Sequence, residues 1–265
     1  MPEETENAVR IAPIRIAPIR IAMWSGPRNI STAMMRSFEN RPDTAVVDEP
    51  FYAAYLQMTG IDHPMTEEII ADGETDWKKV VDFLLGPVPE GCLVFYQKQM
   101  THHMIDGVGR DWLDDVVNVF LIRRPESVLA SYSAKREEVT LRDIGFQEQA
   151  DIFDEVADRL GKAPPVIDAA DVLADPRVTL IRLCEAVGIP FSENMLSWPA
   201  GRRDSDGVWA PHWYGAVEKS TGFAPPSKPV AYDDLSDDLK PICDAARPLY
   251  ERLAWYRIMG DASED

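Results

Sequence analysis

The sequence predicts an α/β protein in which helices cover both faces of a mostly parallel central sheet, giving three α/β/α layers. Two observations predict this class. Strand-like apolar stretches alternate with helix-like stretches along most of the chain, and the stretch VVNVFLIRR at residues 116–124 is apolar almost throughout. Such a continuous apolar run is typical of a parallel strand that is buried on both faces.

Local signals place each element in order. The expected strands are residues 20–24, 44–50, 92–98, 116–124 and 166–168. The expected helices are residues 30–39, 76–85, 125–135, 178–187 and 235–259. Pro50 ends the second strand, Pro125 stands at the favoured first position of a helix, and Gly188 stops the helix before it.

The N-terminal part contains a five-residue repeat, RIAPI, within residues 10–22. A period of five matches neither a strand nor a helix, and Pro13 and Pro18 interrupt any ladder of hydrogen bonds. We therefore expect an extended tail over residues 1–19 and a single domain over residues 20–265, since no shift in composition divides the rest.

Composition excludes several classes of function. A net charge of −18 argues against nucleic acid or an anionic membrane as partner, because both require a basic surface. No apolar run is long enough to cross a membrane, and the acidic start MPEETENAVR does not resemble a signal peptide, so we expect a cytoplasmic protein. The scattered cysteines and histidines predict no metal site. The oligomeric state stays open, with a homodimer as one option.

The junction between the first strand and the first helix has the composition of an anion-binding turn. Gly26 allows close backbone approach, Arg28 adds positive charge, and the helix start offers free N–H groups. The candidate binding residues are Gly26, Pro27, Arg28, Asn29, Ile30, Ser31 and Thr32. The alternative is a helix capped by Asn29 beside an exposed arginine.

The same turn does not fit the ATP-binding pattern G-x-x-x-x-G-K-[ST]. Counted from Gly26, the second glycine would be Ser31, the lysine Thr32 and the magnesium-binding hydroxyl Ala33. Three of the four requirements are not met. The turn therefore predicts an anion site that differs from an ordinary nucleotide triphosphate loop.

Other polar residues follow the ends of neighbouring strands, where parallel sheets bind their ligands. Arg123 and Ser131 could hold a phosphate together, although a surface arginine and a helix serine are an equally simple explanation. The catalytic candidates are Arg28, Glu49, Lys98, His102 and His103, since histidine or glutamate can take a proton and the cations can stabilise negative charge. Adjacent surface histidines and a structural glutamate are the alternatives.

The segment GRRDSDGVWAPHWY at residues 201–214 mixes cations, glycine and aromatic residues. This mixture suits a lid over a flat anionic ligand, with Arg202 and Arg203 as candidate ligand contacts. A packed surface loop is the alternative. Residues 52–80 and 137–160 are expected to shape a pocket for a second substrate.

Taken together, these segments resemble the sulfotransferase superfamily, whose members use 3′-phosphoadenosine 5′-phosphosulfate (PAPS). The family loop P-[KR]-S-G-T-[TS] corresponds to residues 27–32, with Asn29 in place of serine and Ile30 in place of glycine. The family's arginine and serine eight residues apart correspond to Arg123 and Ser131, and GRRDSDGVW and DEPF resemble further family segments. The tryptophan that often follows the loop is Ala33 here.

The resemblance covers roughly residues 20–225 and implies a P-loop nucleotide-hydrolase-like fold. It also implies transfer of a sulfuryl group from PAPS to a hydroxyl or amine of a small molecule, without a metal. The loop would hold the 5′-phosphate, while Arg123, Ser131, Arg202 and Arg203 would recognise the 3′-phosphate. A non-catalytic nucleotide-binding protein and a nucleotide-dependent kinase are the rival hypotheses.

Overall fold

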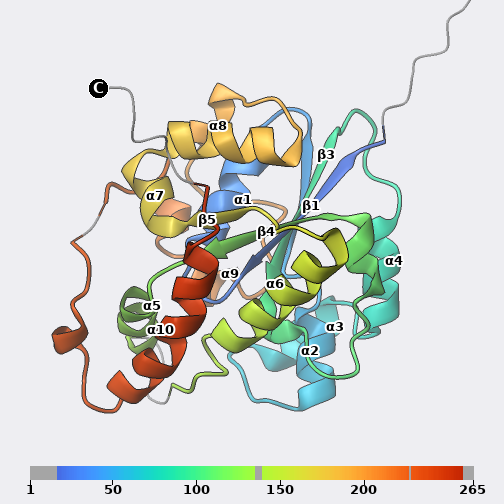
Figure 1. Ribbon diagram of the computed structural model, residues 1–265. Coiled ribbons are helices and arrows are strands. Elements are labelled where there is room, and N and C mark those ends of the chain that lie inside the picture. Colours follow the sequence, from blue (N-terminus) through green and yellow to red (C-terminus); the bar gives the residue numbers. More distant parts are fainter. Residues whose placement is uncertain (1–16, 135–138, 227, 259–265) are drawn as a thin grey trace, which may run out of the picture.

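The computed structural model describes residues 17–134, 139–226 and 228–258. Its centre is a five-stranded sheet of order β2-β3-β1-β4-β5, in which every neighbouring pair is parallel (Figure 1). The strands are β1 (Ile19–Ser25), β2 (Thr44–Asp48), β3 (Val94–Met100), β4 (Val117–Ile122) and β5 (Val166–Asp168). The predicted three-layer α/β class is confirmed. The RIAPI repeat lies mostly outside the described residues.

Helices connect the strands and cover both faces of the sheet. The longer helices are α1 (Ser31–Glu39), α2 (Tyr52–Thr59), α3 (Thr66–Asp72), α4 (Trp77–Leu85), α5 (Pro125–Ser133), α6 (Phe146–Leu160), α8 (Pro176–Val187) and α10 (Lys240–Ala254). The shorter ones named below are η1 (Thr101–His103), α7 (Ala169–Ala174) and α9 (Ala210–Trp213).

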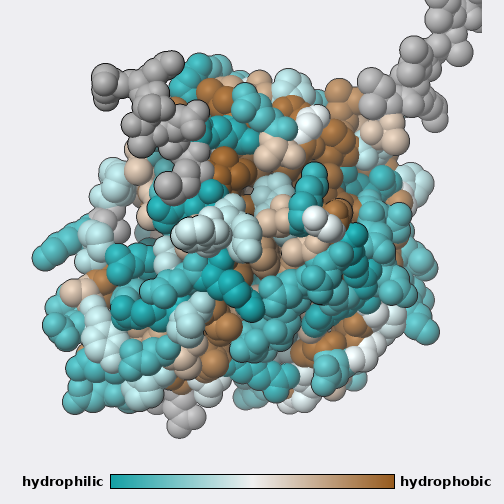
Figure 2. All heavy atoms as spheres, in the orientation of Figure 1, coloured by the Kyte–Doolittle hydropathy of each residue, from teal (hydrophilic) through white to brown (hydrophobic). Residues whose placement is uncertain are grey.

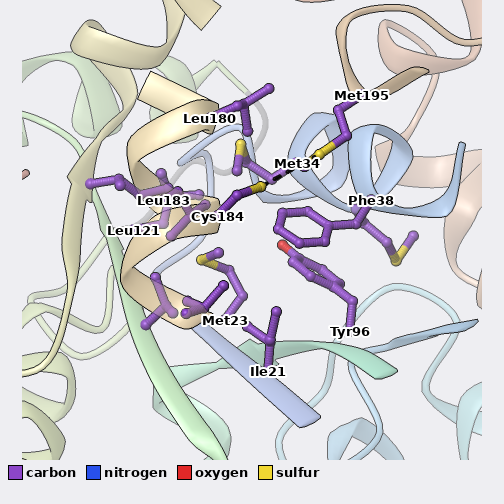
Figure 3. Close-up of a cluster of buried hydrophobic side chains, with 14 of the residues drawn as sticks. Ile21, Met23, Met34, Phe38, Tyr96, Leu121, Leu180, Leu183, Cys184 and Met195 are labelled. Carbon is purple, nitrogen blue, oxygen red and sulfur yellow. Dashed lines mark hydrogen bonds between the residues drawn. The ribbon is translucent and has the colours of Figure 1, made fainter. Parts of the chain in front are cut away.

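One face of the sheet packs against α1, α7 and α8. Alternation along β1 directs Ile21 and Met23 to this side, where they meet Phe38 of α1 and Cys184 of α8 in one buried cluster (Figure 3). The ring of Phe38 stacks on that of Tyr96 from β3, with centroids 4.5 Å apart. This packing holds α1 against β1 and β3, and it thereby positions the loop that joins β1 to α1.

The opposite face packs against α4, α6 and α10. Ala22 and Trp24 of β1 point to this side and join Phe120 of β4 and Phe153 of α6 in a second cluster. The outer surfaces of α6 and α10 are mainly hydrophilic, as Figure 2 shows for this side of the molecule. Each of these helices therefore has one buried and one solvated face.

Parallel register brings the strand ends together at one edge of the sheet. Ser25 at the end of β1 lies opposite Met100 of β3, and Asp48 at the end of β2 lies opposite Lys98. The segments that follow these strands must therefore meet there. This edge carries the site described below.

Some element boundaries differ from the sequence prediction. The last helix begins at Lys240 rather than residue 235, with Pro241 in its first turn, where a missing N–H costs no helical hydrogen bond. It ends at Ala254, and residue 259 lies outside the described residues. Helices α2, α3 and α6 were not among the predicted elements. In the described part of the chain, no helix is long and apolar enough to cross a membrane.

Candidate functional site

The loop between β1 and α1 holds two non-glycine residues in left-handed backbone conformation. Arg28 has a φ of 63° and Ile30 a φ of 57°, values that L-residues other than asparagine and aspartate rarely adopt. Between them, the buried Asn29 donates from Nδ2 to the carbonyl oxygen of Leu121 at 3.3 Å. Asn29 therefore ties the loop to β4 and does not cap α1, contrary to the alternative reading of the sequence.

Gly26, which precedes this turn, lies where the backbone of the loop passes close to the backbone at Ile144. A Cβ atom at Gly26 would lie 2.4 Å from the carbonyl oxygen of Ile144. Only glycine fits this approach without displacing the neighbouring segment. The N-terminus of α1 has no side-chain cap, so the first N–H groups of the helix remain available to a ligand.

Two guanidinium groups meet beside this loop. Arg28 donates from Nε to Ser131 Oγ at 2.8 Å, and Arg123 donates from Nη1 to the carbonyl oxygen of Arg28 at 2.6 Å. Among the described residues, neither has a carboxylate within ion-pair distance. Burial lowers the pKa of both, and for Arg123 the charge of Arg28 adds to the effect. Two half-buried guanidiniums without an ion-paired carboxylate among the described residues form a candidate anion site, and only the more distant charge of Asp168 opposes the shift at Arg123.

Lys98 has a different environment from the two arginines. Its side chain is 1% exposed, and Nζ donates to Asp48 Oδ1 at 2.8 Å, to Glu49 Oε1 at 2.7 Å and to the Tyr214 hydroxyl at 2.6 Å. Burial alone would lower the pKa of Lys98, but the two carboxylates outweigh it and raise the pKa well above the ordinary value. Lys98 is therefore a permanent, fully bonded cation, and its bonds do not lead to Arg28.

Glu49 is the carboxylate of this cluster that lines the pocket. Its backbone φ is 42°, and its N–H donates to the carbonyl oxygen of Lys98 at 3.0 Å. Lys98 hydrogen-bonds to Oε1 of the carboxylate. The Glu49 side chain is 12% exposed and lines the pocket, which leaves Oε2 open to a ligand there. Burial raises the pKa of Glu49 despite the opposing charge of Lys98. A carboxylate of this kind suits proton transfer.

The two adjacent histidines lie in an aromatic cluster. The His103 ring lies 4.8 Å from the ring of Tyr52 and 4.8 Å from that of Tyr55, stacked on both. Burial lowers the pKa of His103 well below its usual value and that of His102 to about 3. Both imidazoles are therefore neutral at physiological pH. Both ring nitrogens of His103 are buried and lack a hydrogen-bond partner among the described residues. In His102 this is true of Nδ1 but not of Nε2, so Nε2 is the nitrogen that can face the pocket.

The segment around residues 201–214 contributes its aromatic end to the site. Trp213 and Tyr214 line the pocket, whereas Arg202 and Arg203 do not. Arg202 is exposed, and Arg203 donates from Nη2 to the carbonyl oxygen of Pro199. The structure thus does not bring these two predicted contacts to the pocket.

Acidic and glycine residues of the same segment anchor it instead. Asp206 accepts two hydrogen bonds from the buried Arg36 of α1, at 2.5 and 2.7 Å. Gly207 has no room for a Cβ, which would lie 2.2 Å from the Trp209 ring. The segment is therefore held near its middle by Asp206 and at its end by Tyr214.

These groups surround one cavity of about 450 Å³. The predicted site residues that line it are Pro27, Arg28, Asn29, Ile30, Ser31, Thr32, Glu49, Lys98, His102, His103, Arg123 and Ser131. Within the described residues, no group of histidine, cysteine, aspartate or glutamate side chains is arranged to hold a metal. The cavity combines an anion site, an open carboxylate and neutral aromatic walls.

Comparison with known proteins identifies the family. The family model described as Sulfotransferase domain matches residues 19–255. The chain belongs to the sulfotransferase domain family. The resemblance predicted from its motifs is thus confirmed.

Two curated relatives and one solved structure add to this picture. Branched-chain-amino-acid aminotransferase-like proteins 2 and 1 of Arabidopsis thaliana are 36% and 37% identical over 230 and 231 residues, which cover 84% of this chain in each case. The chain spans only 40% and 41% of the length of these relatives. The sulfotransferase domain from the curacin biosynthetic pathway is 16% identical with a TM-score of 0.50, covering 87% of this chain and 98% of that domain, and it supports the fold.

Ile30 occupies a position where the family loop pattern has a different residue. The sulfotransferase loop pattern has glycine at this position, and the left-handed backbone of Ile30 is a conformation that glycine adopts without strain. Isoleucine maintains the same conformation here while its side chain packs against the cluster that contains Met34. The loop therefore holds an isoleucine in a backbone conformation that favours glycine.

Several site residues escaped the sequence prediction. Tyr52, which begins α2, and His63, which follows it, both line the cavity, and the Tyr52 hydroxyl lies 2.9 Å from His63 Nδ1. They fall in the range 52–80 that was expected to shape a pocket, but no signal distinguished them individually. None of the described residues of 137–160 lines the cavity, but Gly145 of this range accepts a hydrogen bond from Thr101 Oγ1 at 3.0 Å, next to His102.

Proposed function

We propose that this protein transfers a sulfuryl group from PAPS to a hydroxyl or amine of a small-molecule acceptor. The observation that carries the proposal is the pair of half-buried guanidiniums of Arg28 and Arg123, which have no carboxylate partner among the described residues and adjoin an uncapped helix start. Such a site suits a polyanion, because each guanidinium can pair with a separate anionic group. A compound with both a phosphosulfate and a separate phosphate satisfies this requirement.

The residues of the chain divide the binding task. Ser31, Thr32 and the N-terminal N–H groups of α1 would hold the 5′-phosphate, and Arg123 with Ser131 would hold the 3′-phosphate. When bound, PAPS supplies the sulfuryl group and an adenosine bisphosphate leaving group. Arg28 lies between these two sets and would stabilise the charge that develops on the leaving phosphate. Arg202 and Arg203, which lie away from the cavity, have no part in this assignment.

Glu49 is the preferred base among the three candidates. Its open Oε2 and raised pKa suit removal of a proton from an acceptor hydroxyl, whereas a histidine with a pKa of about 3 is a weak base. Lys98 orients Glu49 through the Nζ to Oε1 hydrogen bond, and His102 can accept or donate a hydrogen bond beside it. His103 supports the wall of the pocket from within the aromatic cluster.

Binding and transfer can be tested separately. We expect adenosine 3′,5′-bisphosphate to raise the melting temperature, and ATP with magnesium to do so much less. Sulfate transfer from labelled PAPS to an acceptor panel then tests catalysis, with Arg28→Ala as the diagnostic variant. Stabilisation by ATP and magnesium alone would favour the kinase hypothesis. Bisphosphate binding without any transfer would favour the non-catalytic one.

A further inference from the structure

The cavity has two chemically different ends. Arg28, Arg123 and Ser131 form one hydrogen-bonded group, which we call the arginine end. A separate group of contacting rings includes Tyr52, His63 and His102. This group adjoins Glu49, because the Tyr52 N–H donates to the Glu49 carbonyl oxygen at 3.0 Å. We call this second group, together with Glu49, the acceptor end.

The acceptor end carries a net negative charge. Lys98 is the cation next to it, and its ammonium is already hydrogen-bonded to the carboxylates of both Asp48 and Glu49. When Glu49 is ionised, as its role as a base requires, one positive and two negative charges leave a net charge of −1 in this cluster. Glu49 Oε2, its open oxygen, is the part of that charge that meets the cavity.

No positive charge arises from His102 or His103. Burial keeps both His102 and His103 neutral, and each lies beside another histidine that would further oppose protonation. Among the described residues that line the cavity, the lysine and arginine side chains are Arg28, Lys98 and Arg123, and the two arginines belong to the other end. Within the described residues, the acceptor end therefore offers a ligand no lysine or arginine that lacks a carboxylate partner, and its histidine His63 lies with Nδ1 2.9 Å from the Tyr52 hydroxyl.

An acceptor with a carboxylate or phosphate of its own would meet Glu49 without a counterion. At an effective dielectric constant of about 20, two like charges roughly 5 Å apart repel strongly enough to weaken binding by a factor on the order of 100. The remaining walls do not offset this repulsion, since Met100, Trp213 and Val217 offer mainly apolar surface. Such walls suit the uncharged body of a ligand.

We propose that the acceptor is a hydroxyl compound that carries no negative charge. This inference rests on the sulfuryl transfer proposed above. The hydroxyl lies beside Glu49 Oε2 and the apolar body lies against Met100, Trp213 and Val217. In the transfer, the acceptor oxygen forms a bond to sulfur as the bond from sulfur to the phosphate oxygen breaks. The proton passes to Glu49, and the electron pair leaves with adenosine bisphosphate.

Matched acceptors that differ only in charge test the proposal. One set is para-ethylphenol, tyramine and para-hydroxyphenylpropanoate, and a second is butanol, aminobutanol and hydroxybutyrate. In each set the anionic member should have a kcat/KM at least tenfold below that of its neutral counterpart. An anionic member that reacts equally well or better overturns the proposal. So does the absence of transfer to every member while the bisphosphate binds.

A charge-introducing variant supplies a second measurement. Val217→Lys places a cation at the acceptor end, and Val217→Met is the uncharged control of similar length. The lysine variant should reduce discrimination against the anionic members at least threefold relative to the methionine variant. Unchanged discrimination would show that charge is not its cause. Loss of the thermal shift with adenosine 3′,5′-bisphosphate in the wild type would instead refute the proposed function itself, so the two failures are distinguishable.

Discussion

Tyr214 makes the contacts that hold the late loop onto the ends of β2 and β3. Its hydroxyl donates to Asp48 Oδ2 at 2.6 Å and accepts from Lys98 Nζ at 2.6 Å and from Trp209 Nε1 at 3.2 Å. The residue is 4% exposed, so water cannot replace these bonds. Burial, together with the charge of Asp48, raises the pKa of Tyr214 well above its ordinary value, and the hydroxyl remains neutral.

Tyr214→Phe removes this hydroxyl and leaves the two charged partners in place. A hydrogen bond to a charged group contributes about 1.5–3 kcal/mol. Asp48 keeps a long contact from the Gly207 N–H at 3.4 Å, and Lys98 keeps two carboxylates, so the lower end of that range applies to each bond. We therefore expect a loss of about 3 kcal/mol in the free energy of unfolding, or roughly 6–12 °C in melting temperature for a domain of this size.

Tyr232→Phe is the matched control. It removes the same atom from a hydrogen bond to a carboxylate, here Asp244 Oδ2 at 2.9 Å, but in a solvent-exposed position. Water replaces that bond, so we expect no measurable change in stability. Chemical denaturation of both variants and of the wild type gives the comparison. If Tyr214→Phe were no more destabilising than Tyr232→Phe, the cluster would not hold the loop as argued.

Three further predictions concern the loop, the base and the anion site. Ile30→Gly should be at least about 1 kcal/mol less destabilising than Ile19→Gly. Both variants lose a half-buried isoleucine, but only Ile30→Gly relieves a left-handed backbone conformation. Denaturant unfolding of the two variants makes the comparison. Sulfate transfer should be lost as the pH falls through a value above the usual pKa of glutamate, because Glu49 must be ionised to act and burial raises its pKa. His102→Gln should retain this acidic limb in the pH–rate profile, and its disappearance would reassign the base. Arg123→Ala should weaken the binding of adenosine 3′,5′-bisphosphate at least tenfold, as measured by calorimetry, since one hydrogen bond to a charged group contributes about 1.5–3 kcal/mol. An unchanged affinity would contradict the assignment of Arg123 to the 3′-phosphate.

The sequence was sufficient to predict which residues line the cavity at the sheet edge, because chain order determines where parallel strands end. Buried apolar runs mark the strands, and in a parallel sheet the residues after each run share one edge. Glu49, Lys98 and Arg123 were placed at that edge for this reason, and the structure shows that each of them lines the cavity.

Pairing between distant residues is where the sequence was insufficient. Asp48 and Tyr214 are 166 positions apart, and nothing local in either segment specifies their hydrogen bond. The same limit applies to Arg36 and Asp206, 170 positions apart, although that pair fixes the loop predicted to act as a lid. The basic residues of that loop drew attention because the expected ligand is anionic, yet its acidic and aromatic residues make the contacts near the site. Charge type predicts which ligand a segment suits, whereas the fold decides which of its side chains face inward.

Backbone strain provides a final link between sequence and chemistry. Among the described residues, four other than glycine have positive φ, and three of these, Arg28, Ile30 and Glu49, line the cavity. Each such conformation costs about 1–2 kcal/mol and persists only where surrounding contacts determine it. Asn29 supplies such a contact within the loop through its bond to the Leu121 carbonyl oxygen. Because the loop shape is thus fixed before any ligand arrives, an anion meets N–H groups and a guanidinium that are already positioned. Isoleucine at position 30 pays a conformational cost that glycine would avoid. The apolar surface that its side chain buries offsets this cost.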